Sequence, residues 1–414
     1  MTAADRSRLR LDGWLEVMEN PMVTKASVRL LLSIVSVILA FAGDAQACAI
    51  CFRGLAVTPG QKLDAADQAV LAAPVDGQGQ FRVMEIVKGN GAVGDVVVQP
   101  GLSTPVAEAV ISVDGLTVGD GEAAKLDEKP LLLLHDTVSE KWTSLGAMPI
   151  DFAGWLRQLA QTKQSAETPT RIWPQLTLTS SYLTDAEWGE RIVVIAPQLQ
   201  SPEPLVAEIA YGELSRAPYG VTRLLKSQLE PAKLVAWTND PTLASRRPAY
   251  TLLLGIAGGP DTAVALEQQI DTALTTRDAT NLSALLAADL ELRGAGRVDW
   301  LETTFFADRQ RTLPEIQAAL LALSVHGGAD GSIPRRRVIE AYRYFIKARK
   351  PMAGFVAMEL ADWEAWDATA DYVDIIRSKA VRDPAEQFAI LSYLKRSPLT
   401  TAQAALGPSA DQRQ

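Results

Sequence analysis

Between residues 64 and 148, hydrophobic positions either alternate with polar ones or form short runs that end at glycine, as in β-strands. Two stretches between these segments, 76–79 and 88–91, have turn composition, with glycine where a positive φ angle is needed. The segments with strand character are 69–73, 81–87, 95–99 and 131–134. The pattern predicts a small β-barrel or sandwich of five to seven strands within residues 48–149.

The spacing of hydrophobic residues changes after Asp151, where Phe152, Trp155, Leu156 and Leu159 recur with helical periodicity. We predict a helix and a polar linker over residues 150–170, then helices joined by short turns over 171–406, and a disordered tail over 407–414. Thr184 and Glu187 have the spacing of a capping box at a helix start. Five prolines are expected near the first turn of a helix, where a missing N–H costs nothing: Pro231, Pro260, Pro314, Pro334 and Pro384.

An internal repeat lies within the helical part. Three segments share an apolar helix end, a small or glycine-containing turn and the start of a new helix: 252–260, 290–296 and 321–328. Gly258 and Gly294 are 36 residues apart, Gly294 and Gly327 are 33 apart, and a fourth turn is expected at Ala361-Asp362. Periods of this size correspond to one helix pair per unit. We therefore predict an all-α, HEAT-like helical solenoid after the β domain, with an ordinary helical domain as the alternative.

Two resemblances bear on this architecture. Residues 81–89 with 94–98 resemble the opening of an OB-type barrel, such as a netrin-like module. Segments of the helical half resemble a set of uncharacterised exported bacterial proteins: Ala217-Pro218-Tyr219, Leu234 to Trp237 before Asp240-Pro241, Tyr250 to Gly255, Ala322 to Gly327 and Ala361 to Trp366. The second resemblance implies a signal peptide, a Cys-Pro-x-Cys-type motif, a small β domain and a helical-repeat region, but no activity. The chain departs from it at Ala49, where those proteins often have proline.

The first 47 residues have the features of an export signal. Lys25 and Arg29 provide a basic start, the run 30–42 is apolar apart from two serines, and Ala45-Gln46-Ala47 suits a signal peptidase. Cleavage near Ala47 predicts a periplasmic or secreted protein whose mature chain begins at Cys48.

Three alternatives remain open at this end of the chain. Translation from Met22 would give a more compact signal. An uncleaved anchor over residues 28–47 is opposed by its 13-residue apolar run, since a helix needs about 20 residues to cross a bilayer. A lipid on Cys48 would anchor the protein, although Ala45 and Gln46 fit a lipoprotein signal poorly.

Cys48-Ala49-Ile50-Cys51 contains both cysteines of the chain. The pair could form a short structural disulfide, act as a redox couple, or carry the lipid at Cys48. A zinc site would need further strong ligands, and the chain offers only two histidines. Haem attachment would need a histidine where Phe52 stands. We expect neither a metal nor another cofactor.

Composition excludes one class of partner. The 414 residues have a net charge of −9, and the longest basic tract is Arg335-Arg336-Arg337. Nucleic acid is therefore not an expected partner, because neutralisation of phosphates provides most of that affinity. The basic tract, with Lys347, Arg349 and Lys350, is either a solvated helix face or a docking patch for an acidic partner or a membrane headgroup.

The remaining chemical motifs are incomplete. His135 and His326 are expected to be hydrogen-bonded structural residues, since no Gly-x-Ser-x-Gly turn accompanies them. Trp363 and Trp366, with the acids at 362, 364, 367 and 371, could form a sugar platform, but tryptophans at helical spacing usually pack against the next repeat. Residues 119–122 and 328–332 lack the alternating acids of a calcium loop, and 89–94 has the G-x-G-x-x-G spacing without a following helix.

We therefore expect an exported, non-enzymatic protein that acts as a scaffold for a protein or a component of the cell envelope. A thiol redox protein that uses Cys48 and Cys51 is the first alternative, and a lipid-anchored envelope scaffold is the second.

Overall fold

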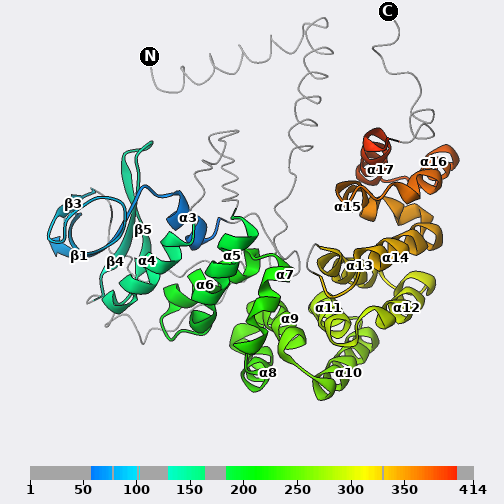
Figure 1. Cartoon of the computed structure of the whole chain (residues 1–414), viewed down its shortest axis with the longest axis horizontal. Coiled ribbons are helices and arrows are strands. Elements are labelled where there is room, and N and C mark those ends of the chain that lie inside the picture. Colours follow the sequence, from blue (N-terminus) through cyan, green and yellow to red (C-terminus); the bar gives the residue numbers. More distant parts are fainter. Residues whose placement is uncertain are drawn as a thin grey trace, which may run out of the picture. The chain divides into compact units, whose positions relative to one another are not determined.

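The computed structural model describes residues 57–76, 79–99, 102, 129–163, 183–328 and 331–398. This part of the chain is an α+β protein in which a curled antiparallel sheet, a half-barrel, precedes a series of helices (Figure 1). The predicted signal region, both cysteines, most of the predicted linker and the tail lie outside the described residues.

The sheet has the strand order β3-β2-β1-β4-β5, with every neighbouring pair antiparallel. Its strands are β1 Gln68–Asp76, β2 Gln80–Lys88, β3 Val96–Val98, β4 Leu131–Asp136 and β5 Lys141–Ala147. The four predicted strand segments are confirmed, and so is the turn at 88–91, where Gly89 has a φ of +82°. β5 was not predicted, because its residues are mostly half-buried and do not alternate between apolar and polar.

The two faces of the sheet pack into two different clusters. On one face, residues such as Val70, Phe81 and Leu133 form a small cluster of their own. On the other face, Leu71 and Leu132 belong to a large core that continues through the helices. The sheet and the helices therefore share one hydrophobic core.

A short helix, α3 (Pro59–Ala65), precedes the sheet and was not predicted. Thr58 and Gln61 form a capping box at its start, and Pro59 occupies its first turn. The Thr-Pro-x-Gln sequence was therefore a readable signal for this helix. α3 packs against helix α6 (Pro204–Arg216), so it connects the sheet end of the core to the helical part.

The helical part confirms the local predictions. Thr184 and Glu187 form the predicted capping box of α5 (Asp185–Ile195), and four of the five prolines lie in a first turn, with Pro334 at the N-cap. The remaining helices are α4 Ala153–Gln161, α7 Tyr219–Thr222, α8 Pro231–Asn239, α9 Arg247–Ala257, α10 Pro260–Thr276, α11 Leu282–Arg293, α12 Val298–Leu301, α13 Leu313–Gly327, α14 Arg335–Ala348, α15 Ala357–Asp362, α16 Thr369–Ser378 and α17 Pro384–Arg396.

Each of the three repeat segments is a turn between two helices, as predicted. α9 leads into α10, α11 into α12 and α13 into α14. α9 packs on α11, and α11 packs on α13. The α9–α11 contact is close, because a side chain at Gly255 would overlap the backbone of Ala288. At the second turn Gly294 has a φ of +70°, a conformation that favours glycine.

Candidate functional site

Two adjoining cavities, each of about 510 Å³, lie along the ends of the helix pairs. Lys226, Ile256 and Glu291 line both cavities, so we describe them as one groove. Its walls come from η4, a short 3-10 helix at Arg223–Ser227, from the end of α9, from the start of α10 and from the end of α11.

Local sequence explains why these segments meet. Pro218 precedes α7, and the chain tightens from α7 into η4, which places Arg223 and Lys226 on the groove. Gly258 and Gly259 separate α9 from α10, and a side chain at Gly258 would overlap Thr262. The predicted repeat turn therefore supplies part of the groove wall.

Glu291 is the central charged group of the groove. Its Oε1 accepts a hydrogen bond from Nε of Arg223 at 3.0 Å, and its Oε2 accepts one from the Tyr219 hydroxyl at 3.0 Å. Only 10% of the Glu291 side chain is exposed, whereas 36% of Arg223 is. Glu291 thus holds two neighbouring elements, α7 and η4, against α11.

Lys226 and Arg293 are the other cations of the groove, and they differ in their partners. Arg293 binds Asp289 at 2.8 Å and Glu267 at 2.7 Å, and Arg297 binds the same two carboxylates. Lys226 is exposed and forms no ion pair with any described residue. Its charge is therefore available to a ligand at the junction of the two cavities.

His326 lies behind Glu291 and is completely buried. Its Nε2 is 2.8 Å from the carbonyl oxygen of Ala287, and its Nδ1 is 2.9 Å from Oγ of Ser332. Burial lowers the pKa of His326 from 6.5 to about 4, against the opposing effects of the Ala287 carbonyl and Glu291. His326 is thus a neutral, hydrogen-bonded residue, as predicted, and does not reach the groove surface as a base.

A second charged cluster, fully buried, joins α3 to the helical part. Arg191 on α5 binds Asp64 on α3 at 3.0 Å and Glu213 on α6 at 2.6 Å, and Arg216 binds Glu213 at 2.8 Å. The Thr58 hydroxyl also donates to Glu213, at 3.4 Å. We call Asp64, Arg191, Glu213 and Arg216 the buried quartet. It is closed to solvent, so we assign it a structural role.

Burial raises the pKa of Asp64, and the nearby Arg191 guanidinium acts in the opposite direction. Lys88 lies beside this cluster and donates to the carbonyl oxygens of Leu63 and Asp64. Burial lowers the pKa of Lys88.

The predicted basic patch is partly occupied by internal contacts. Arg337 binds Glu302 and Asp299, Arg335 donates to the carbonyl of Gly327, and Arg349 donates to backbone carbonyls near Phe306. Arg335, Arg336, Lys347 and Lys350 are exposed, Arg337 is half-buried, and Arg349 is buried. Four of the six basic residues are thus exposed to solvent, as on a solvated helix face, while Arg337 and Arg349 are held by internal contacts.

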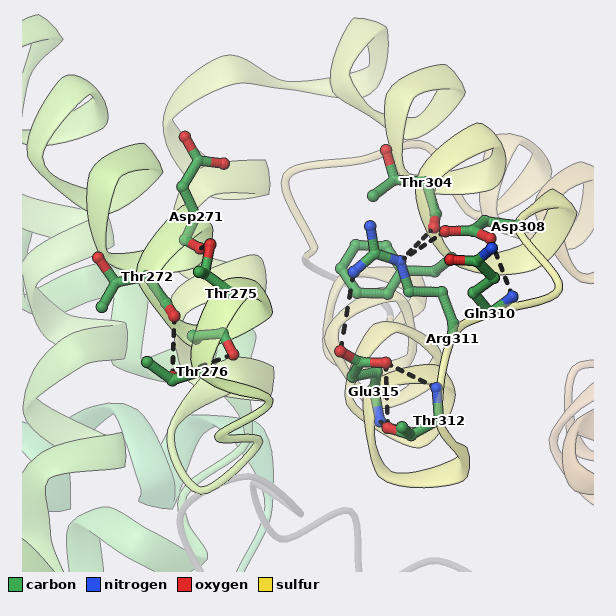
Figure 2. Close-up of polar contacts among 12 residues, drawn as sticks. Asp271, Thr272, Thr275, Thr276, Thr304, Asp308, Gln310, Arg311, Thr312 and Glu315 are labelled. Atoms are coloured by element: carbon green, nitrogen blue, oxygen red, sulfur yellow. Dashed lines mark hydrogen bonds and ion pairs between the residues drawn. The ribbon is translucent and has the colours of Figure 1, made fainter.

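A similar arrangement is seen in the loop before α13 (Figure 2). Arg311 donates to the carbonyl of Thr304 at 2.9 Å and lies 3.1 Å from Asp308 and 3.7 Å from Glu315. Thr312 and Glu315 form the capping box of α13 in the same view. The contacts of Arg311 thus stabilise a loop, whereas Lys226 has no ion-pair partner among the described residues.

The remaining sequence candidates are placed as follows. Trp363 stacks on Tyr342 with ring centroids 5.7 Å apart, and Trp366 packs on Tyr393, so both half-buried tryptophans pack against residues of neighbouring helices. His135 packs on Trp142 at 4.9 Å, but its buried Nδ1 has no hydrogen-bond partner among the described residues, so the prediction of a hydrogen-bonded residue is wrong for this nitrogen. Cys48, Cys51 and residues 119–122 lie outside the described residues.

Sequence reasoning did not identify the groove. Arg223, Lys226 and Glu291 were not candidates, because none belongs to a motif and their contacts join segments 68 residues apart. The glycine turn after α9 was the one available signal, since Gly258 and Gly259 line the second cavity.

Comparison of the chain with protein-family models, with curated proteins and with solved structures finds no match. Among the described residues no helix combines the length and apolar character needed to cross a membrane. In that same part of the chain, no group of three or more His, Cys, Asp or Glu residues is arranged to hold a metal ion.

Proposed function

We propose that the protein is a non-enzymatic scaffold whose groove binds a segment of another protein or a component of the cell envelope. The observation that carries this proposal is the pair of adjoining cavities that share two charged residues. Lys226 forms no ion pair with a described residue, and Glu291 is bound to Arg223 but still lines both cavities. Volumes of this size are typical of binding sites. Charges of both signs at the junction favour a partner segment that carries at least one carboxylate near an apolar side chain.

The lining of the groove supports binding of a side chain rather than a purely electrostatic contact. Leu224 is 60% exposed at the edge of the first cavity, and Val264 is 54% exposed at the edge of the second. Ile256 lies between them and is buried. An apolar floor with a cation at its centre suits an amphipathic segment.

The architecture that we propose around the groove is a HEAT-like solenoid after an OB-like barrel. The succession of α9, α11 and α13 and the repeated glycine turns support the first part. The curled sheet supports the proposed OB-like barrel. In a solenoid, the ends of the helix pairs form a row, which is where the groove lies.

We also propose that the protein is exported and acts in the periplasm or outside the cell, or is anchored to the membrane at Cys48. The support is the signal pattern of residues 25–47. Mass spectrometry of the native N-terminal peptide distinguishes the outcomes. A peptide that begins at Cys48 and lacks two hydrogens indicates a cleaved signal and a disulfide, whereas a mass increased by acyl chains indicates lipidation. An intact residue 22–47 segment would contradict cleavage.

Site-specific photo-crosslinking tests the binding proposal. The full-length protein carries benzoylphenylalanine in place of Leu224, and the control carries it in place of Leu391 on α17, which is also exposed. We expect a discrete adduct in an envelope extract at 224 only. Lys226→Glu should weaken this adduct by about fivefold, as for loss of a charged contact worth about 1 kcal/mol. Equal adducts at both positions, or none at 224, would contradict the proposal.

A further inference from the structure

The hydrogen bonds of His326 define which ring nitrogen carries its proton. The Ala287 carbonyl oxygen can only accept, so Nε2, at 2.8 Å, must be the protonated nitrogen. Nδ1 is then an acceptor and receives the Ser332 hydroxyl at 2.9 Å. In its neutral state His326 therefore has both nitrogens satisfied.

A second acceptor lies close to the same nitrogen. Oε2 of Glu291 is 3.7 Å from Nδ1 of His326, just outside hydrogen-bond distance. That oxygen currently accepts the Tyr219 hydroxyl, and the other carboxylate oxygen binds Arg223. The Tyr219 ring also meets the His326 ring edge-on, with centroids 5.0 Å apart. A small shift of Glu291 would thus change its contacts with both α7 and η4.

We propose that His326 is an acid-sensitive switch behind the groove, which on protonation draws Glu291 away from Arg223 and Tyr219 and loosens η4. A proton from solvent adds to Nδ1, which then becomes a donor. The Ser332 hydroxyl can rotate to accept, but the Glu291 carboxylate is the charged acceptor and is favoured in a buried setting. The inference rests on the groove being the binding site, and it concerns how that site is regulated.

The groups that face His326 come from each element packed against it. Glu291 comes from α11, Arg223 from η4, Tyr219 from α7 and Ser332 from the turn before α14. Burial is the main cause that lowers the pKa of His326 to about 4, and Arg223 acts in the same direction, while Glu291 opposes it. The switch therefore operates in strongly acidic surroundings, near pH 4, and the groove keeps its neutral arrangement near pH 7.

Loosening of η4 affects the groove directly. η4 carries Arg223, Leu224 and Lys226, all of which line the first cavity. When the Glu291 carboxylate turns toward His326, one negative charge moves away from Arg223, which lines the first cavity. The groove thus becomes more positive under acid conditions and should hold an acidic segment more tightly for as long as that segment stays ionised.

Histidine NMR gives the first test, because the chain contains only two histidines. His135→Gln in the full-length protein leaves the His326 signal alone. We expect Ser332→Ala to raise its titration midpoint, since the neutral form loses its donor, and Glu291→Gln to lower it, since the imidazolium loses its anion. Ser324→Ala is the matched control, because that serine binds Glu359 instead. A midpoint unchanged in Glu291→Gln would overturn the proposal.

Hydrogen exchange tests whether the groove responds. Between pH 7 and pH 4, after correction for intrinsic rates, the 219–227 segment should exchange about tenfold faster, as for a local opening made easier by about 1.4 kcal/mol. The change should be absent in His326→Gln, and strand β4 should not change in either protein. Acceleration of both segments would indicate global unfolding and overturn the switch, as would no acceleration at 219–227. Neither readout needs a partner, whereas crosslinking at Leu224 near pH 7 tests the binding proposal alone.

Discussion

Glu213 and Glu291 are two carboxylates with nearly the same set of partners and very different surroundings. Each binds an arginine of another element and a hydroxyl group: Arg191 and Thr58 in the first case, Arg223 and Tyr219 in the second. The side chains of Glu213 and Arg191 are entirely buried, while Arg223 is 36% exposed.

The difference shows what each cluster can do. In the buried quartet every charge faces an opposite charge, and water cannot replace a missing partner. Removal of one member therefore leaves a desolvated charge. Arg223 is 36% exposed and Glu291 is 10% exposed, so water can replace part of this contact and the carboxylate can change partners at a lower cost than Glu213. The first cluster holds α3 in place, and the second can respond to a ligand or a proton.

The largest effect is expected when the buried quartet loses its central cation. Arg191→Met keeps the apolar volume but leaves Asp64 and Glu213 without their shared guanidinium. We expect the free energy of unfolding to fall by about 3–5 kcal/mol. Urea denaturation at pH 7 measures it.

Arg336→Met is the control for this change, since Arg336 is 91% exposed and pairs only with Glu340. It should alter the free energy of unfolding by less than about 0.5 kcal/mol. Equal effects of the two substitutions would show that the quartet contributes no more than a surface pair.

The next largest effect is a loss of stability at low pH, which comes from His326 behind the groove. His326 is neutral in the folded protein down to a pKa of about 4, whereas the unfolded chain takes up its proton near 6.5. The unfolded state binds more protons in this window, so the free energy of unfolding falls as the pH drops through it and this contribution is constant below pH 4. The loss from this one group is about 3 kcal/mol.

Comparison of variants isolates this contribution. Urea denaturation at pH 7 and at pH 4 should show a smaller pH-dependent loss in His326→Gln than in the wild type. His135→Gln should keep the wild-type loss, because its ring packs on Trp142 away from the groove. An unchanged pH dependence in His326→Gln would show that His326 does not cause the loss, and that the Glu291 cluster does not respond to a proton.

A smaller effect tests how tightly the buried quartet is packed. A methyl group at Gly60 on α3 would overlap the Glu213 carboxylate, which cannot move without losing Arg191 or Arg216. We expect Gly60→Ala to lower the free energy of unfolding by about 1–3 kcal/mol. Gly154→Ala on α4 is the matched control, because nothing lies within 4 Å of the added methyl group. That change should stabilise the protein by about 0.5–1 kcal/mol. If both substitutions destabilised the protein equally, the loss at Gly60 would not come from overlap with Glu213.

The features that the sequence predicts well are those that depend on neighbouring residues. The capping box at Thr184 and Glu187, the proline at the start of α10 and the glycine turn at Gly294 each depend on contacts within a few positions. Alternating residues in β2 likewise reveal a half-buried strand. β5 was not predicted, because most of its residues are half-buried.

The two charged clusters could not be predicted in this way. Asp64 and Arg191 are 127 residues apart, and Arg223 and Glu291 are 68 apart. Nothing near Arg191 in the sequence distinguishes it from the exposed arginines. Its role follows only from the packing of α3 and α5 on α6, and the same holds for Glu291, whose partner Arg223 is brought near by the packing of η4 and α11 on α9.

The smallest expected effect comes from the exposed counterpart of Arg191. Arg223→Met removes the cation beside Glu291, but the carboxylate keeps the Tyr219 hydroxyl and remains accessible to water. We expect the free energy of unfolding to fall by less than about 1 kcal/mol. The same urea experiment measures it, beside Arg191→Met, which makes the identical chemical change at a buried carboxylate. A loss as large as that of Arg191→Met would mean that Glu291 is as closed to solvent as Glu213, and the groove could then not exchange its contacts with a partner.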